Sequence, residues 1–140
     1  MTQKIILDTG PLVAYIDKSD RFHNWAQEVL QGIPMPLFTC EAVISEACFL
    51  LRKTYGGKDA VMSLVKAGII EVPFRFSEEV DRIDVLMKQY QSVPMSFADG
   101  CLVRMTELIS GSSVLTLDRD FQIYRKNRNE AIALLISDEL

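Results

Sequence analysis

The chain has 140 residues, a net charge of −4 and 24% charged residues, which is ordinary for a globular protein of one domain's size. A chain of this length buries roughly two thirds of its unfolded surface, so we expect one domain over residues 1–140 and no linker. No apolar run approaches the ~20 residues of a membrane span, and the beginning of the chain lacks a signal peptide's long apolar region. We therefore expect a cytoplasmic protein without a membrane partner.

The cysteines argue against a zinc site, and the net charge limits how the protein could bind nucleic acid. Cys40, Cys48 and Cys101 form no CxxC pair, and the single His23 has no spacing that would complete a zinc site with them. We interpret the cysteines as reduced packing residues. The acidic net charge argues against coating nucleic acid through bulk charge, although a local basic surface could still bind it. The same charge is compatible with a cluster of metal-binding carboxylates.

The first predicted element is a buried strand at residues 5–7, where a short apolar run stops at Asp8. Gly10 and Pro11 do not continue a strand easily, and Pro11 suits the first turn of a helix, so we predict a helix over residues 12–16. Asp8 then lies at the carboxyl end of a strand, which is where open α/β sheets bind ligands. The alternative is that Asp8 only caps the next helix.

The rest of the chain alternates between apolar patterns of helical period and short apolar runs. The predicted helices cover residues 22–33, 41–55, 58–67, 77–91 and 97–109, the last with Ser96 as its N-cap. The predicted strands cover residues 37–39, 69–72, 113–117 and 131–136. This alternation indicates an α/β protein with a parallel sheet.

Two helical acids stand out because their neighbours are apolar. The residues three and four positions away from Glu46 are all apolar, and those around Asp99 are mostly so. Burying an unpaired carboxylate is costly, so a metal or another cationic partner is expected for Glu46. The alternatives are an edge position at which Glu46 reaches water, and an Asp99 that only favours the helix dipole. Gly100 leaves room beside Asp99 for a ligand or backbone.

The strand predicted over residues 113–117 ends, like the first one, in an acid, which is Asp118. Two strands that end in Asp and two helices that each present one acid are hard to explain as four separate caps. If the four acids converge at the carboxyl edge of the sheet, their oxygen atoms favour Mg²⁺ or Mn²⁺. Two such ions roughly 4 Å apart can promote phosphodiester hydrolysis, and a site with one ion is the alternative.

The segments that carry these acids resemble, in order and over nearly the whole chain, the PIN domain family. They are residues 6–12, 44–47, 96–102 and 115–121. The resemblance implies an α/β three-layer sandwich, with a central, mainly parallel sheet of about five strands flanked by helices. It also implies a Mg²⁺- or Mn²⁺-dependent endoribonuclease acting on single-stranded or structured RNA. At this size the chain is similar to the VapC toxins of bacterial and archaeal toxin–antitoxin systems.

The same resemblance implies roles for particular residues and partners. Its core catalytic and metal-binding acids would be Asp8, Glu46 and Asp99, followed by Asp118 and a further acid, Asp120, with Thr9 and Thr116 as supporting hydroxyls. It also implies a homodimer, and a cognate antitoxin that occludes the acidic pocket. Basic residues that could hold RNA phosphates, or could be solvated surface charge, are Arg52, Lys53, Arg119, Arg125, Lys126 and Arg128.

Three other functions are alternatives to an active toxin. A phosphatase of the haloacid dehalogenase type also has an Asp after its first strand, but it needs a second Asp two residues later, where this chain has Gly10. A catalytically inactive PIN-fold interaction module would only bind a partner, and the intact set of acids argues against it. A PIN nuclease that processes RNA without an antitoxin is the third alternative.

Overall fold

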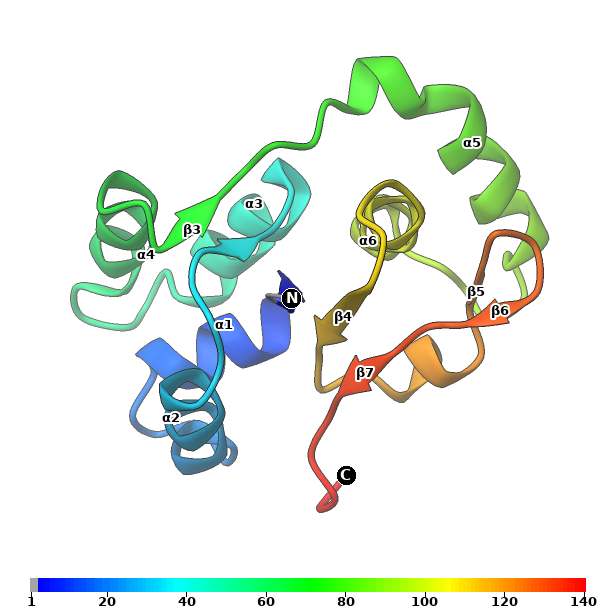
Figure 1. Cartoon of the computed structure of the whole chain (residues 1–140). Helices are drawn as coiled ribbons and strands as arrows, with labels where there is room; N and C mark the ends of the chain where they lie inside the picture. Colours follow the sequence, from blue (N-terminus) through cyan, green and yellow to red (C-terminus); the bar gives the residue numbers. More distant parts are fainter. Residues whose placement is uncertain (1–2) are drawn as a thin grey trace.

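A computed structural model of the protein describes residues 3–140. Its centre is a sheet of five strands, all parallel to their neighbours, in the order β3-β2-β1-β4-β7 (Figure 1). The strands are β1 (Lys4–Leu7), β2 (Leu37–Phe38), β3 (Ile70–Glu71), β4 (Ser112–Leu115) and β7 (Leu134–Leu135). A separate antiparallel hairpin consists of β5 (Arg125–Lys126) and β6 (Glu130–Ala131). The predicted α/β fold with a central parallel sheet is therefore confirmed.

Helices flank this sheet on both sides. They are α1 (Thr9–Ile16), α2 (His23–Gln31), α3 (Glu41–Leu50), α4 (Gly57–Lys66), α5 (Phe76–Gln89) and α6 (Phe97–Leu108), with a short 3-10 helix, η1 (Arg119–Gln122). Helices α1, α2 and α4 lie on one side of the sheet and α5 and α6 on the other (Figure 1). Helix α3 contacts α1, α4 and α6. Across residues 3–140 we find no helix with the length and apolar character needed to cross a membrane.

The core is centred on the two middle strands, β1 and β4. Ile5, Ile6 and Leu7 are at most 1% exposed, because helices cover both faces of a central strand in a parallel sheet. Leu7 pairs with Leu115 at the carboxyl ends of β1 and β4. The residues that follow these two strands therefore emerge side by side at one edge of the sheet.

Several predicted ends were wrong. The helix predicted over residues 41–55 ends at Leu50, because turns lead from there to Gly56, whose φ of +68° is left-handed and breaks the helix. The strand predicted over residues 113–117 ends at Leu115. The remaining helices and the strands β1, β2 and β3 are present, and their ends differ from the predicted ones by at most three residues.

The last predicted strand, residues 131–136, is divided between two sheets. Only Leu134 and Leu135 join the central sheet, next to β4, whereas Ala131 pairs with Arg125 in the hairpin. The hairpin was not predicted from the sequence. Its strands have only two residues each and no apolar alternation, so periodicity could not reveal them.

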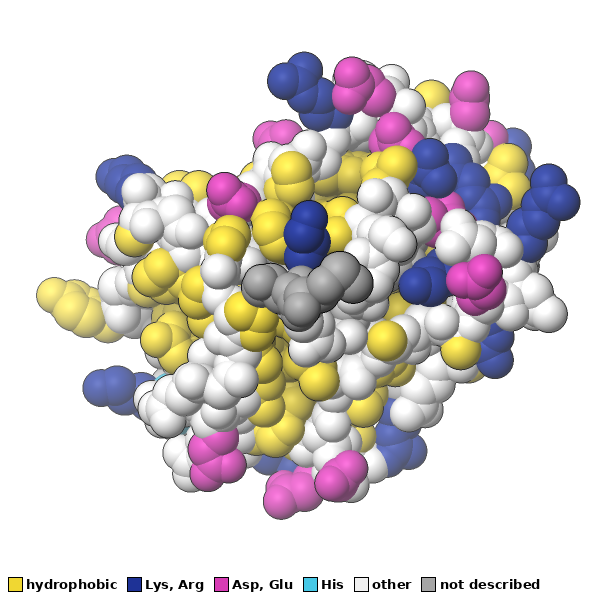
Figure 2. Space-filling view, viewed as in Figure 1, with side chains coloured by type: hydrophobic (Ala, Val, Ile, Leu, Met, Phe, Trp, Pro, Cys, Tyr) yellow, Lys and Arg dark blue, Asp and Glu magenta, His cyan; other side chains and the backbone are white. Residues whose placement is uncertain are grey.

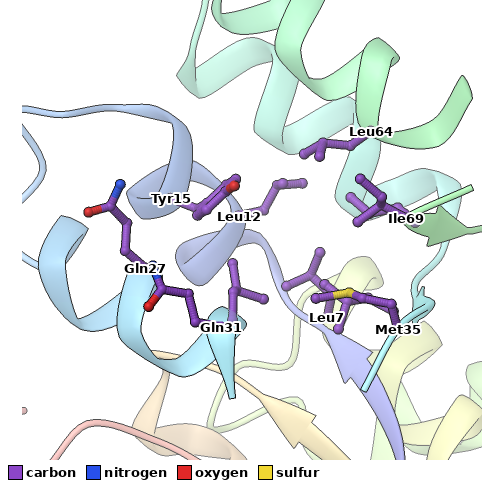
Figure 3. A pocket seen from close by; sticks show the side chains of 11 residues that line it. Leu7, Leu12, Tyr15, Gln27, Gln31, Met35, Leu64 and Ile69 are labelled. Carbon is purple, nitrogen blue, oxygen red and sulfur yellow. The ribbon is translucent and has the colours of Figure 1, made fainter. Parts of the chain in front are cut away.

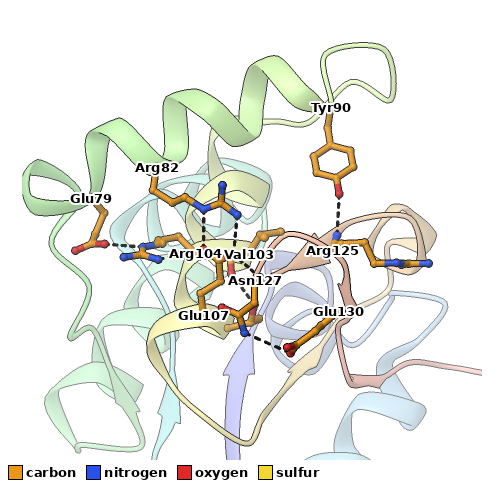
Figure 4. A network of polar contacts seen from close by, with 10 residues as sticks. Glu79, Arg82, Tyr90, Val103, Arg104, Glu107, Arg125, Asn127 and Glu130 are labelled. Carbon is orange, nitrogen blue, oxygen red and sulfur yellow. Dashed lines mark hydrogen bonds and ion pairs between the residues drawn. The ribbon is translucent and has the colours of Figure 1, made fainter.

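A network of ion pairs holds this hairpin against α5 and α6 (Figure 4). The Glu107 side chain is 2% exposed and accepts hydrogen bonds from Arg82, at 2.7 and 2.9 Å, and from Arg104, at 3.1 Å. It also accepts the backbone N–H of Asn127 at 2.6 Å, and Arg104 pairs with Glu79 at 2.6 Å. Burial opposes the ionisation of Glu107, but these donors prevail and lower its pKa. Glu107 is therefore a charged anchor for three elements.

Candidate active site

Asp8 follows β1 directly and is also the N-cap of α1, so the predicted strand end and the capping role belong to one residue, and its role as a ligand stays a prediction. Its Oδ1 accepts a 2.7 Å hydrogen bond from the Thr9 N–H, and its Oδ2 accepts a 2.6 Å bond from the Thr116 hydroxyl. Burial raises the pKa of Asp8 to about 7. The two hydrogen bonds limit this rise, and the charges of Asp99 and Asp118 add to it. A buried carboxylate in the field of two others is a good ligand for a cation.

Asp99 lies in the first turn of α6, where the Ser96 hydroxyl accepts its backbone N–H at 3.0 Å, as the predicted N-cap requires. The residue is 8% exposed, and its side chain accepts a 2.9 Å hydrogen bond from the Tyr124 hydroxyl. Burial raises the pKa of Asp99, the bond from Tyr124 opposes that rise, and the charge of Asp118 adds to it. Asp99 therefore shares one electrostatic environment with Asp8 and Asp118.

The Thr116 hydroxyl connects the ends of β1 and β4. While donating to Asp8, it accepts the backbone N–H of Asp118 at 2.9 Å. Asp118 in turn caps η1, because its Oδ1 accepts the N–H of Asp120 at 2.9 Å. Partial burial and the charge of Asp118 raise the pKa of Asp120. Asp120 is thus a fourth acid in the same field.

Thr9 and Gly10 shape the space between these acids. Thr9 is 3% exposed, and its hydroxyl has no hydrogen-bond partner within the described part of the chain. A Cβ at Gly10 would lie 3.2 Å from Cβ of Leu117, so the glycine lets α1 approach the segment that carries Asp118. A buried hydroxyl without a partner is expected to be satisfied by a ligand or an ordered water.

The residues fit a hard divalent cation in their chemistry, since their donors are carboxylate and hydroxyl oxygens. Among residues 3–140, however, no three Asp, Glu, His or Cys side chains lie close enough together to hold a metal ion as they stand. The negative charge of Asp118 contributes to the raised pKa of both Asp8 and Asp99. The same repulsion between carboxylates favours side-chain positions that keep them apart when no cation is bound. A Mg²⁺ or Mn²⁺ site is thus supported by donor chemistry, and its coordination geometry stays a prediction.

The surroundings of Glu46 differ from the expectation. Glu46 is exposed, and its neighbours Phe49 and Leu50 are 61% and 52% exposed, so this side of α3 faces solvent rather than protein. The alternative of an edge position is the one observed. The role of Glu46 as a metal ligand stays a prediction, but burial of its carboxylate no longer supports it. Gly100 also differs, because a Cβ there would be in ordinary van der Waals contact with Ile83 of α5 at 3.4 Å, so the space beside Gly100 is occupied by side chains of the protein.

Two of the predicted RNA-contact residues, Arg52 and Arg125, form hydrogen bonds within the chain. Arg125 donates through Nη1 to three carbonyl oxygens at the end of η1, at 2.9 to 3.4 Å. Arg52 donates to the carbonyl oxygen of Phe49 and lies 4.1 Å above its ring. Arg52, Lys53, Arg119 and Arg128 are exposed, whereas Arg125 and Lys126 are half-buried. On the face shown in Figure 2, basic side chains gather mainly over α5 and the hairpin.

An apolar cavity of about 240 Å³ lies away from the acids, between α1, α2 and α4 (Figure 3). Leu7, Leu12 and Met35 contribute to its wall, and Gln27 and Gln31 border it. Among the residues that the structure describes, its lining contains no carboxylate and no basic side chain.

Two residues near the site were missed by the sequence analysis. Tyr124 is fully buried and donates to Asp99, and burial together with the charge of Asp99 raises the pKa of the Tyr124 phenol. Thr39 donates a 2.7 Å hydrogen bond to the carbonyl oxygen of Leu7, which fixes the end of β1. The three-residue spacing of Phe121 and Tyr124, typical of one face of a 3-10 helix, was the signal that could have revealed the tyrosine.

This fold and site define an α/β sandwich in which the charges of Asp8, Asp99 and Asp118 act on one another near the carboxyl edge of the sheet. A family model described as PIN domain matches residues 5–127, and the chain belongs to the PIN domain family. The predicted family resemblance is confirmed.

Two known proteins are similar to the chain. Ribonuclease VapC26 of Mycobacterium tuberculosis is 25% identical over 118 residues, which are 82% of this chain and 87% of that protein. The crystal structure of Mycobacterium tuberculosis VapC20, a sarcin-ricin loop cleaving toxin, matches with a TM-score of 0.74 and 18% identity. That match covers 86% of this chain and 94% of VapC20. At this identity it supports the fold alone.

Proposed function

We propose that the protein is an endoribonuclease that uses Mg²⁺ or Mn²⁺ to hydrolyse phosphodiester bonds in RNA. The observation that carries this proposal is the placement of Asp8 and Asp118 after β1 and β4, where the Thr116 hydroxyl bonds to both residues and the charges of Asp99 and Asp118 act on Asp8. Membership of the PIN domain family and similarity to a protein named as a ribonuclease support it. The function is thus inferred from the site and the family together.

The five acids are proposed to contribute unequally to metal binding. In this proposal the cation is held by Asp8, Asp99 and Asp118, with Glu46 and Asp120 as further acids. A bound divalent cation supplies positive charge that makes a water more acidic and offsets charge on the scissile phosphate. The chain contributes orientation, because Thr116 fixes one oxygen of Asp8 and the backbone of Asp118 at the same time. The unpartnered Thr9 hydroxyl is available to bind a water or a phosphate oxygen.

The substrate is proposed to be single-stranded or structured RNA. Lys53 and Arg119 are exposed and can approach phosphates without breaking an intrachain bond seen in the fold. Arg52 and Arg125 already donate to carbonyl oxygens, so their contribution would come from the remaining guanidinium N–H groups. Basic side chains of this kind position the backbone and do not select a sequence.

The proposed partners are an antitoxin and a second copy of the chain. An antitoxin that places a basic side chain among the acids would relieve their mutual repulsion. Exposed apolar side chains on and after α3, namely Phe49, Leu50 and Tyr55, are suited to a homodimer contact. We also propose that the protein acts in the cytoplasm, where its RNA substrate is present.

The test compares the wild type with Asp99→Asn on single-stranded RNA, with Mg²⁺, with Mn²⁺ and with chelator. We expect cleavage by the wild type with metal, and a loss of roughly 100-fold or more in the variant and in chelator. Asp84→Asn is the matched control, because Asp84 is an exposed acid paired with Lys88 on α5. Cleavage that survives in both Asp99→Asn and chelator would contradict the proposed chemistry.

The toxin role is tested separately from the chemistry. We expect expression of the wild type, but not of Asp99→Asn, to arrest growth, and a short reading frame for the antitoxin beside the gene. Cleavage without growth arrest and without such a reading frame would favour RNA processing. The exposed position of Glu46 is the observation that favours an inactive PIN interaction module, and no cleavage with either metal would support that alternative.

A further inference from the structure

Tyr124 lies outside the set of acids but contacts one of them. Its hydroxyl donates a 2.9 Å hydrogen bond to Oδ2 of Asp99, and the residue is 0% exposed. A phenol can only donate to an ionised carboxylate, so the direction of this bond is fixed. The contact joins the segment after β4 to the first turn of α6.

The bond to Tyr124 restricts how the Asp99 carboxylate can turn. The terminal torsion of an aspartate has a broad, roughly two-fold preference, so without such a partner the carboxylate samples many orientations. In the part of the chain that the structure describes, the side-chain bond of Asp99 goes to Oδ2, and Oδ1 has no hydrogen-bond partner. The hydroxyl therefore occupies one oxygen and leaves the other available.

The phenol ring is itself held in place on several sides. It packs edge-on against Tyr90, with centroids 5.1 Å apart, and against Phe121, with centroids 5.2 Å apart. The Tyr90 ring supplies this packing, whereas its hydroxyl points to the backbone and accepts the Arg125 N–H at 3.0 Å (Figure 4). A side chain locked by packing in this way can transmit a fixed orientation to the group that it contacts.

We propose that Tyr124 is a positioning residue that orients the Asp99 carboxylate, so that its free oxygen stays available to the catalytic cation. This inference rests on the proposed function, because it assumes that Asp99 is a metal ligand. Tyr124 acts through Asp99 and takes no part in the chemical step. Partners that orient metal ligands typically contribute tenfold or more to metal affinity.

The experiment removes one hydroxyl at a time from the same buried aromatic cluster. Tyr124→Phe keeps the ring and deletes the donor to Asp99. Tyr90→Phe is the matched control, because its hydroxyl is bonded to the Arg125 backbone and contacts no acid. Mn²⁺ affinity is measured by calorimetry, kcat and KM on RNA by initial rates, and folding by circular dichroism.

We expect Tyr124→Phe to weaken Mn²⁺ binding roughly 10-fold and to lower kcat more than it raises KM. Tyr90→Phe should stay within about 2-fold of the wild type in both. In an Asp99→Asn background, Tyr124→Phe should cause no further loss of Mn²⁺ affinity. Equal Mn²⁺ affinity in the wild type and Tyr124→Phe, or an undiminished loss in the Asp99→Asn background, overturns the inference.

A second measurement does not depend on a folded variant. The hydroxyl proton of Tyr124, observed by NMR in the wild type, should exchange slowly because it is buried and bonded. A rapidly exchanging proton overturns the inference. A wild type that binds no Mn²⁺ and cleaves no RNA overturns the proposed function and the inference together, whereas a wild type that does both leaves Tyr124→Phe to decide the inference alone.

Discussion

The Thr116 hydroxyl donates a 2.6 Å hydrogen bond to Oδ2 of Asp8, although 108 positions separate the two residues. The same hydroxyl accepts the Asp118 N–H, so one oxygen atom holds two of the proposed ligands at a fixed separation. Replacement of this hydroxyl should therefore disturb the acids more than it disturbs the fold.

Thr116→Val should reduce RNA cleavage by roughly 10-fold or more and raise the pKa of Asp8 further, because a bond that stabilises the carboxylate is lost. The stability cost should be about 1–2 kcal/mol, measured by urea unfolding. Thr106→Val is the control, since its equally buried hydroxyl donates to the Val103 carbonyl oxygen, remote from the acids. Equal losses of cleavage in the two variants would show that Thr116 has only a structural role.

Asp8 should make the stability of the metal-free protein decrease as the pH rises. The pKa of Asp8 is about 7 in the folded protein and close to 3.8 when unfolded, so between these values the folded state binds more protons. The free energy of unfolding should therefore fall from about pH 4 to about pH 7 and level off above, by a few kcal/mol at most. Asp99, whose pKa is also raised, contributes in the same direction.

This pH dependence is measured by urea unfolding with chelator from about pH 5 to about pH 8. Asp8→Asn should remove most of the slope, because the amide does not titrate. Parallel pH profiles for the wild type and Asp8→Asn would mean that another group causes the effect.

Mg²⁺ should stabilise the folded protein above pH 7, where Asp8 is ionised. A ligand at about ten times its dissociation constant adds about 1.4 kcal/mol to the free energy of unfolding. The melting temperature should rise with Mg²⁺ concentration in the wild type and remain nearly constant in Asp8→Asn. A similar rise in both proteins would indicate binding elsewhere on the acidic surface.

Glu107→Gln should destabilise the protein by about 2 kcal/mol, because it leaves Arg82 and Arg104 without their shared carboxylate. This figure is below that for fully buried pairs, since both arginine side chains are 26% exposed. Asp84→Asn breaks the exposed pair with Lys88 and should change stability by less than about 0.5 kcal/mol. Urea unfolding of the two variants compares them directly, and similar losses would argue against Glu107 as an anchor.

The features that could be predicted from the sequence are those with a local cause. The apolar run before Asp8 indicated a buried strand, and Ser96 indicated the start of α6, because strand burial and N-capping depend on a few adjacent residues. Glu46 shows the limit of this approach. Its apolar neighbours suggested burial, but whether a helix face meets protein or water depends on the packing of the whole helix.

The sequence by itself therefore determined the α/β class, the order of the main helices and of the strands of the central sheet, and the acids that follow β1 and β4, since period and capping are local properties. The tertiary structure decided which acids lie close enough to affect one another's pKa, and which side chains donate hydrogen bonds to them. The bonds from Thr116 to Asp8 and from Tyr124 to Asp99 each join different elements. Such contacts form only when distant segments pack together, and no local pattern encodes them.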